Sequence, residues 1–320
     1  MRAVVCEELG SVVVSELKPI EAGPGQVVID VEAAGVNYVD ALFVRGRYQI
    51  KPPLPFVPGG EVAGTVAAVG PGVTEPAIGT RVLAMCALGG FASQVAVPAT
   101  AAVPIPERLD ALRAATFTQS HCTGLYALRD RGGLRPGEAV LVLGAGGGVG
   151  LAAVRLATAL GARVLAGASS PAKREAALAA GAAATVDTSA ADVKAAARDW
   201  SEGGVDLVYD PVGGALADPA LRALRDRGRY LTIGFASGAI PSLPLNQVLL
   251  RNRSIVGVDW GNWAMTHPAE QRVLLDDLLT MVTAGDLDPV PPHSEPLDRA
   301  AEVLDDLLER RITGKVALIP

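Results

Sequence analysis

Residues 138–170, EAVLVLGAGGGVGLAAVRLATALGARVLAGASS, contain the stretch that decides the fold. An apolar segment runs into a glycine-rich turn, an amphipathic helix begins near Val149, and a second apolar segment follows the helix. Strand, tight turn, helix and strand in this order predict a right-handed βαβ unit. Because short apolar strands and helical patterns continue to alternate beyond this stretch, we predict an α/β domain with a parallel sheet.

The glycine-rich turn has the pattern Ala145-x-Gly147-x-x-Gly150, a variant of GxGxxG with alanine first. Small residues at these positions allow a sharp turn, a close approach of the backbone to a pyrophosphate, and tight packing of helix on strand. The pattern lies in the strand–turn–helix–strand context that dinucleotide-binding Rossmann domains require. We therefore predict a bound dinucleotide whose pyrophosphate is held at the start of the helix by Gly147, Gly148 and Val149.

The residues after the second strand predict which dinucleotide binds. Enzymes that use NAD carry Asp or Glu there, which accepts a hydrogen bond from the ribose 2′-hydroxyl. This chain has Ser169 and Ser170, followed by Lys173 and Arg174 one turn into the next helix. Two hydroxyls and two cations suit a 2′-phosphate, and we expect no carboxylate near enough to repel it. We predict that the protein prefers NADPH to NADH. The alternative interpretation is that Lys173 and Arg174 are ordinary solvated helix residues.

The rest of the chain divides into regions with different patterns. Residues 1–117 read as short strands separated by Gly and Pro, which indicates an irregular β-barrel. The last strand, VALIP, is expected to pair back with this barrel. We predict two domains, a discontinuous barrel domain over 1–117 and 265–320 and a Rossmann domain over 118–264.

Composition limits the classes of partner. A formal net charge of −6 without a long run of Lys or Arg argues against nucleic acid or an anionic membrane. We expect no signal peptide and no membrane-spanning segment. The three cysteines, Cys6, Cys86 and Cys122, are far apart, which fits a reducing cytoplasm and excludes a four-cysteine zinc site. We predict a cytoplasmic protein with a small-molecule substrate.

One carboxylate, Glu61, lies among glycines, prolines and aliphatic residues in LPFVPGGEVAG, residues 54–64. A charged group is rarely placed in such surroundings without a partner. Three interpretations are open: a catalytic acid, part of a metal site, or a structural residue.

Several blocks along the chain together resemble a known family. They are GVNYVD, PFVPGGEVAGTVAAVG, TGLYALRDRGGLRPGEAVLVLGAGGGVG, VYDPVGG, YLTIGFASGAIP and RNRSIVGVDWG. The chain resembles the zinc-free, zeta-crystallin-like quinone oxidoreductases of the medium-chain dehydrogenase/reductase superfamily, over nearly its whole length. The resemblance implies a GroES-like β-barrel catalytic domain beside the Rossmann domain.

The resemblance also bears on the role of Glu61. The three zinc-ligand positions of zinc-dependent members are occupied here by Asn37, Gly60 and Gln119. Zinc needs Cys, His or carboxylate donors, so we predict that no metal binds. Glu61 is then expected to be structural, satisfied by backbone N–H groups or by an Arg of the Gly-rich turn. A direct acid–base role stays open as the alternative.

Without a Lewis acid, interconversion of simple alcohols and ketones loses its main electrostatic aid. Acceptors already poised to take hydride, such as quinones, remain accessible, and the cofactor supplies the hard chemistry. We predict an NADPH-dependent quinone reductase whose substrate lies in the cleft between the domains. The alternatives are a reductase of α,β-unsaturated carbonyls, such as an enoyl reductase, and a non-catalytic NADPH-binding protein.

The resemblance implies catalytic roles for three residues of the barrel domain, Asn37, Asp40 and Tyr48. Asn37 and Asp40 would lie near the nicotinamide, and the Tyr48 hydroxyl would donate to the substrate oxygen. Alternatively, Asn37 is a turn residue and Tyr48 a solvated loop residue. His121 is a weaker candidate for proton delivery.

The resemblance also implies cofactor contacts outside the glycine turn, at Thr123 and Arg310. Gly234 and Phe235 follow a later strand and are expected to contact the cofactor where it crosses the edge of the sheet. Thr188 stands where the family often has a Tyr against the 2′-phosphate, and Arg310 is expected to compensate for it. The segment SIVGVDW resembles the edge strand through which the superfamily continues its sheet across two subunits. We therefore predict a homodimer.

Overall fold

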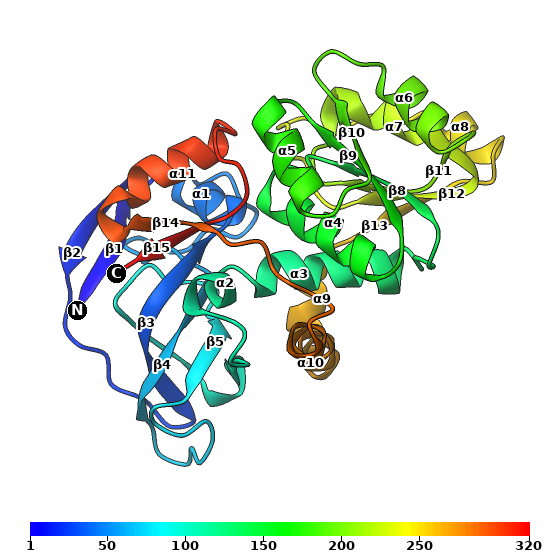
Figure 1. The fold of residues 1–320 in the computed structure, drawn as a ribbon. Coiled ribbons are helices and arrows are strands. Elements are labelled where there is room, and N and C mark those ends of the chain that lie inside the picture. The colour runs from blue at the N-terminus through cyan, green and yellow to red at the C-terminus, as the bar shows by residue number, and fades with distance from the viewer. The chain divides into compact units, whose positions relative to one another are not determined.

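The computed structural model describes all of residues 1–320 and divides into two compact units. Unit 1 comprises Met1–Gln119 and Pro291–Pro320, and unit 2 comprises Ser120–Val290 (Figure 1). None of the helices has the length and apolar character needed to span a bilayer.

Unit 1 contains mostly short strands, as its Gly- and Pro-rich sequence predicts. Its strands are β1 (Arg2–Glu8), β2 (Ser11–Glu16), β3 (Gln26–Val36), β4 (Glu61–Val69), β5 (Arg81–Met85), β6 (Gln94–Pro98), β7 (Ala102–Pro104), β14 (His293–Pro296) and β15 (Val316–Ile319). Its helices are α1 (Tyr38–Val44), α2 (Ala111–Ala115) and α11 (Ala300–Leu308). The main sheet has the order β14-β15-β3-β4-β5-β7, with β6 also paired to β3 and with β1 and β2 forming a separate hairpin.

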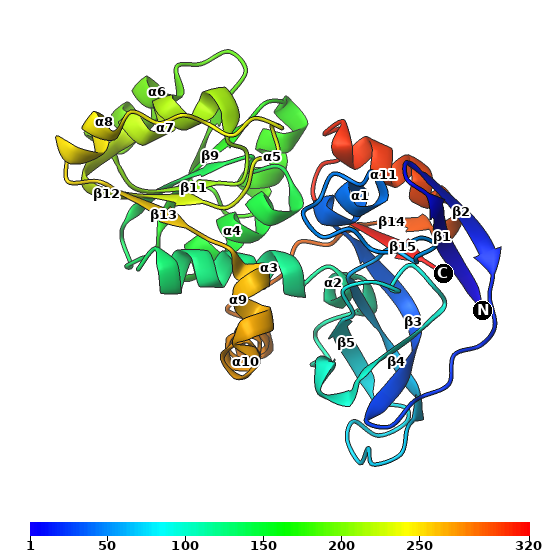
Figure 2. The same ribbon diagram turned by 180° about the vertical axis from the view of Figure 1, so that it is seen from behind.

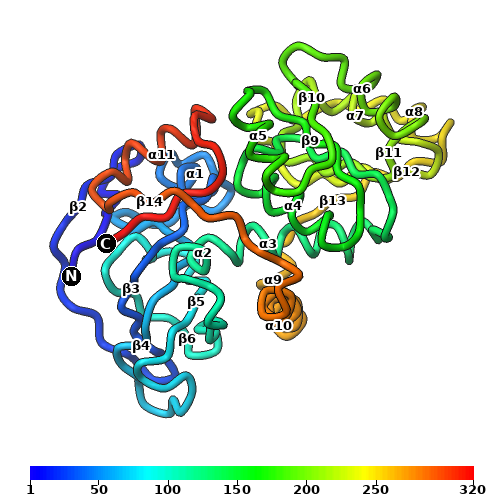
Figure 3. The backbone as a smooth tube through the Cα atoms, in the orientation of Figure 1, coloured from blue at the N-terminus to red at the C-terminus, as the bar shows by residue number.

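The N- and C-termini lie near each other in unit 1 (Figure 3). Strand β15 pairs antiparallel with β3, as expected of the segment VALIP, and the register places Val316 opposite Val36. Strand β3 also pairs with β4, with Gly35 opposite Glu61. A side chain at Gly35 would place its Cβ 2.1 Å from the Ala115 carbonyl oxygen, so only glycine permits α2 to approach this closely. These pairings bring residues 37, 61 and 315 together.

Unit 2 alternates strands and helices. Its strands are β8 (Ala139–Leu143), β9 (Arg163–Ala168), β10 (Ala184–Asp187), β11 (Val205–Asp210), β12 (Leu224–Thr232) and β13 (Ser254–Gly257). Its helices are α4 (Gly148–Ala159), α5 (Pro171–Ala179), α6 (Val193–Trp200), α7 (Ala217–Ala223), α8 (Leu245–Leu249), α9 (Trp260–Thr266) and α10 (Pro268–Ala284), and α3 (Thr118–Leu125) leads into the unit.

All six strands of unit 2 are parallel, in the order β10-β9-β8-β11-β12-β13. Helices α4 and α5 pack on one face of the sheet, and α6 and α7 lie on the other (Figure 2). The chain runs from β8 to β10 in one direction and from β11 to β13 in the other, so right-handed crossovers place their helices on opposite faces. This is the Rossmann order, which confirms the predicted α/β fold class. Ligands of such sheets bind outside the carboxyl ends of the strands, at the reversal between β8 and β11.

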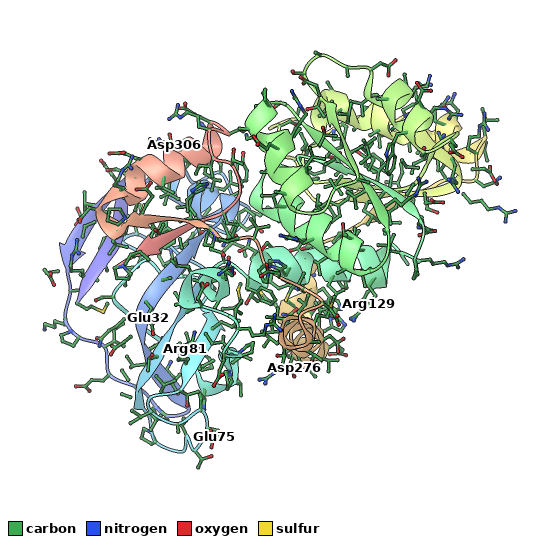
Figure 4. All side chains as sticks on the ribbon, in the orientation of Figure 1. Glu32, Glu75, Arg81, Arg129, Asp276 and Asp306 are labelled. Atoms are coloured by element: carbon green, nitrogen blue, oxygen red, sulfur yellow. The ribbon has the colours of Figure 1, made fainter.

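The division into units differs from the sequence-based boundary at residue 264, because α10 lies in unit 2. The amide of Gln271 on this helix lies 3.4 Å from the Cys122 sulfur. Arg129, which lies beside α10, pairs with Asp277 at 2.8 Å (Figure 4). Both partners belong to unit 2, so these contacts tie α10 to that unit rather than to the barrel.

Candidate functional site

The glycine turn lies at the carboxyl edge of the unit 2 sheet, between β8 and α4. Gly144 adopts a φ of 58°, and the Gly147 N–H donates to the Gly144 carbonyl oxygen at 3.0 Å. Gly147 is the N-cap of α4, and Gly148 and Val149 form its first turn. A Cβ at Gly150 would lie 2.2 Å from the Gly144 oxygen, so the turn tolerates no side chain there. The unpaired N–H groups at this helix start suit a pyrophosphate.

The turn after β9 adjoins the glycine turn. Ser169 is exposed, and Ser170 caps α5, its hydroxyl accepting from the Lys173 N–H at 3.4 Å. Lys173 packs against the glycine turn, since a Cβ at Gly146 would lie 2.4 Å from the Lys173 Cβ. The structure thus brings Lys173, one of the predicted phosphate-binding residues, next to the turn predicted to hold the pyrophosphate.

Arg174 has a partner that the sequence interpretation did not expect. Its guanidinium pairs with Asp187 at 2.9 Å and donates to the Ala168 carbonyl oxygen at 3.3 Å. Asp187 ends β10 and lies opposite Ala168 in the sheet, and Ser189 donates to it twice, which lowers its pKa. The expectation that no carboxylate lies near the predicted phosphate site is wrong, because the adjacent parallel strand supplies one.

Gly234 and Phe235 follow β12 at the same edge of the sheet, and Phe235 is 39% exposed. The turn after β11 is held by a buried carboxylate, Asp210, which the sequence interpretation missed. Asp210 accepts from the N–H groups of Val212 and Gly213 at 2.7 and 2.9 Å and also from the Tyr230 hydroxyl. An Asp before Pro-Val-Gly-Gly is a turn signal that points to this role.

Unit 1 contains a buried polar cluster formed by Asn37, Glu61 and Lys315. Glu61 is 1% exposed, and its Oε1 accepts from the Lys315 ammonium at 3.0 Å and from the Asn37 side-chain amide at 2.9 Å. Its Oε2 accepts from the Gln119 backbone N–H at 3.0 Å. Lys315 also donates to the Asn37 Oδ1. The expected backbone N–H is therefore present, but the cation is Lys315 rather than an Arg of the Gly-rich turn.

Sequence reasoning missed Lys315, although a signal was present. The residue directly precedes VALI, the strand expected to pair with the barrel. A cation at the start of that strand was a candidate partner for a carboxylate in the barrel interior. The register of β15 against β3 decides which side chain Lys315 meets, and the local sequence does not contain this register.

Asp40 lies beside this cluster and is fully buried. Its Oδ2 accepts from the Asn37 backbone N–H at 2.8 Å at the start of α1, while its Oδ1 has no hydrogen-bond partner. Burial raises the pKa of Asp40 from 3.8 to about 7, and Glu61 adds to the increase, whereas the Asn37 N–H and Lys315 oppose it. Asp40 therefore changes charge near neutral pH inside the barrel.

This shift predicts a pH-dependent stability. Between about pH 4 and pH 7 native Asp40 binds a proton that the unfolded chain has released, so stability falls as pH rises through this window. At about 1.4 kcal/mol per pKa unit, the total loss is on the order of 4 kcal/mol. Asp40→Asn keeps an acceptor and cannot ionise. Its free energy of unfolding minus that of wild type is therefore expected to be larger at pH 8 than at pH 5. Urea unfolding of both proteins at the two pH values measures this, and a pH-independent difference would contradict it.

The other predicted residues belong to other elements of the two units. Tyr48 is half-buried after α1, and its ring packs edge-on against Phe43 with centroids 5.0 Å apart. Thr123 and His121 are in α3, and Arg310 is exposed in the turn after α11 in unit 1. The roles assigned to them from the resemblance stay predictions.

Two family models match the chain. The alcohol dehydrogenase GroES-like domain matches residues 23–107, and the zinc-binding dehydrogenase model matches residues 148–275. The second name implies a metal, but the donor set does not suit zinc. No group of three His, Cys, Asp or Glu side chains in the structure could hold a metal ion. The Glu61 carboxylate is instead neutralised by the Lys315 ammonium.

Relatives and solved structures match over almost the full length. The quinone oxidoreductase-like protein 2 homolog of Nematostella vectensis is 38% identical over 99% of this chain and 88% of its own. The quinone oxidoreductase of Thermus thermophilus, solved also with NADPH, is 37% identical, with a TM-score of 0.86 and full coverage of both chains. A phthioceranic/hydroxyphthioceranic acid synthase of Mycobacterium tuberculosis is 35% identical over 93% of this chain but only 14% of its own length. The chain therefore belongs to the quinone oxidoreductase-like family of the medium-chain dehydrogenase/reductase superfamily, as its sequence predicted.

Proposed function

We propose that the protein reduces quinones with NADPH by hydride transfer and without a metal. The observation that carries this proposal is an intact dinucleotide turn in a chain without a metal-ligand group, in which the buried carboxylate of Glu61 forms an ion pair with the Lys315 ammonium. An acceptor that is already electrophilic suits such a site, because no Lewis acid is needed to polarise it. The quinone oxidoreductases among the relatives, one of them solved with NADPH, support the same activity.

The residues of unit 2 would bind and orient the cofactor. Gly148 and Val149, in the first turn of α4, would present backbone N–H groups to the pyrophosphate, and Gly147, without a side chain, would let it approach the backbone. Ser169 and Lys173 would flank the 2′-phosphate. NADPH supplies the hydride when bound, and the protein supplies alignment. Thr123, Ser170, Arg174, Gly234, Phe235 and Arg310 complete the proposed cofactor contacts.

The residues of unit 1 would act on the acceptor. Negative charge develops on the quinone oxygen as hydride arrives, and preorganised donors stabilise it. The Asn37 amide and the Tyr48 hydroxyl are the proposed donors. Asp40 is fully buried and receives the Asn37 backbone N–H, so its proposed part is to hold the start of α1 in place.

A second candidate substrate is an α,β-unsaturated carbonyl. The similarity to part of an acid synthase favours it, because such an enzyme handles acyl groups. The same hydride and the same oxygen-directed donors would serve either acceptor.

Lys173 and Arg174 are expected to contribute unequally to NADPH binding. The Lys173 side chain packs on the glycine turn, next to the proposed pyrophosphate position, and the Arg174 guanidinium reaches to Asp187 on the neighbouring strand β10. Lys173→Ala is expected to raise the KM for NADPH about tenfold, the order of one charge-assisted hydrogen bond, and Arg174→Ala by less. The KM for NADH should stay unchanged in both variants and serves as the control. Equal losses, or a larger one for Arg174→Ala, would contradict this ranking.

A homodimer is part of the proposal. Strand β13 pairs only with β12 and forms one edge of the six-stranded sheet. Exposed apolar side chains gather in this part of the sequence, with Leu249 77%, Leu250 71% and Ile255 40% exposed. A second copy would cover the edge and extend the sheet. Sedimentation velocity over a range of concentrations tests this. The cytoplasmic location and the position of the substrate in an interdomain cleft stay predictions.

The test of the function is steady-state oxidation of NADPH and NADH with an ortho-quinone, with a simple enone run in parallel. We expect kcat/KM to be higher for NADPH than for NADH and higher for the quinone than for the enone. Faster turnover of the enone would favour the second candidate. NADPH binding without turnover of either acceptor would favour a non-catalytic role.

A further inference from the structure

Lys315 and Glu61 together determine which way the side-chain amide of Asn37 faces. An ammonium group has three donors and no acceptor, so the Asn37 atom that it contacts must be the oxygen. The amide nitrogen then faces the Glu61 Oε1, which accepts from it at 2.9 Å. The same Oε1 accepts from Lys315 at 3.0 Å, so the three groups form a closed ring of hydrogen bonds.

Each member of this ring is held from outside it. The second Glu61 oxygen is fixed by the Gln119 backbone N–H at 3.0 Å. Asn37 is fixed at the N-cap of α1, where its own backbone N–H donates to Asp40. Lys315 is fixed by the strand that it precedes, since Val316 lies opposite Val36 on β3. The side chain of Lys315 is 11% exposed, so water competes little for its protons.

We propose that Lys315, as a pair with Glu61, is a positioning residue for the reaction, acting through Asn37. The inference rests on the proposed function, in which the Asn37 amide donates to the acceptor oxygen. With Oδ1 held by Lys315 and one amide hydrogen held by Glu61, only the second amide hydrogen of Asn37 remains for the acceptor. Glu61, which only accepts, also holds the amide nitrogen on its own side. When Lys315 and Glu61 are both replaced, the amide is free to rotate by half a turn and present its oxygen, which repels a developing negative charge.

The decisive protein is the double variant Lys315→Met/Glu61→Gln. It removes the ammonium and the carboxylate together, so no buried charge is left unpaired and the fold is expected to survive. The glutamine introduced by Glu61→Gln imposes no orientation on Asn37, since an amide can accept or donate at this distance. The matched control is Lys18→Met, which removes an exposed lysine of the same unit.

We expect the double variant to melt close to wild type, to keep its KM for NADPH, and to lose about tenfold or more in kcat with the quinone. Lys315→Arg, made with Glu61 intact, keeps a group that only donates. Its kcat is expected to lie between those of the double variant and wild type. A purely structural role predicts the opposite pattern, in which kcat follows the melting temperature across all variants. Wild-type kcat in a double variant that folds normally would overturn the inference.

A readout without turnover separates this inference from the proposed function. The side-chain amide signals of Asn37 in nitrogen-15 NMR are expected to exchange slowly with water in wild type and rapidly in the double variant. If wild type does not reduce quinones but this difference is present, the proposed function fails and the positioning stands. Equal exchange in the two proteins would overturn the positioning, whatever the turnover.

Discussion

Gly150→Ala is expected to abolish NADPH binding at usable concentrations. The added Cβ would lie 2.2 Å from the Gly144 carbonyl oxygen and 2.8 Å from the Ala145 Cα, which are backbone atoms with no rotamer to adopt. Helix α4 must therefore move away from the end of β8, and the N–H groups proposed to hold the pyrophosphate move with it. We expect at least about a 100-fold loss of affinity, equivalent to about 2.8 kcal/mol. Calorimetric titration with NADPH, together with a thermal melt, measures it.

Two further glycine variants show whether this loss has the stated cause. Gly147→Ala places its Cβ 3.5 Å from the Gly144 oxygen, an ordinary contact, so the fold should be kept while the pyrophosphate is obstructed. In Gly261→Ala the nearest atom lies 3.9 Å away, and neither stability nor affinity should change by much. Wild-type affinity in Gly150→Ala would show that α4 does not need to pack this closely.

Lys315→Met is expected to lower the free energy of unfolding by about 3–5 kcal/mol, the usual loss when one partner of a buried ion pair is removed. Glu61 is 1% exposed and would retain only the Asn37 amide and the Gln119 N–H as partners. Neither of these groups carries a charge, so the carboxylate would be buried without a counter-ion.

Urea unfolding of Lys315→Met at neutral pH measures this loss, and Lys18→Met again serves as the control. The loss should be largely recovered when Glu61→Gln is added, because the unpaired carboxylate is then absent. A loss below about 1 kcal/mol, the range of an exposed ion pair, would mean that water reaches this cluster.

The dinucleotide turn was predictable because its constraints are local. The consecutive residues from Ala145 to Gly150 determine a tight turn, a helix start and a close helix–strand contact. The alternation of strands and helices is local in the same sense, and the parallel sheet that it predicts was confirmed.

The partners of the charged side chains were not predictable, because they depend on strand pairing. Lys315 meets Glu61 only because β15 and β4 both flank β3. Asp187 meets Arg174 only because β10 lies beside β9 in register. Neither pair has a fixed spacing in the sequence, so composition and motifs could predict that Glu61 needs a partner but not which residue it is.

The protein is proposed to transfer hydride from NADPH to a quinone without a metal. The measurement that tests it most directly is a single turnover of metal-stripped protein with an ortho-quinone, using NADPH and NADPH deuterated at the transferred C4 position. We predict quinone-dependent oxidation that is slower with the deuterated cofactor and is unchanged by added zinc. No oxidation until zinc is restored would contradict the account.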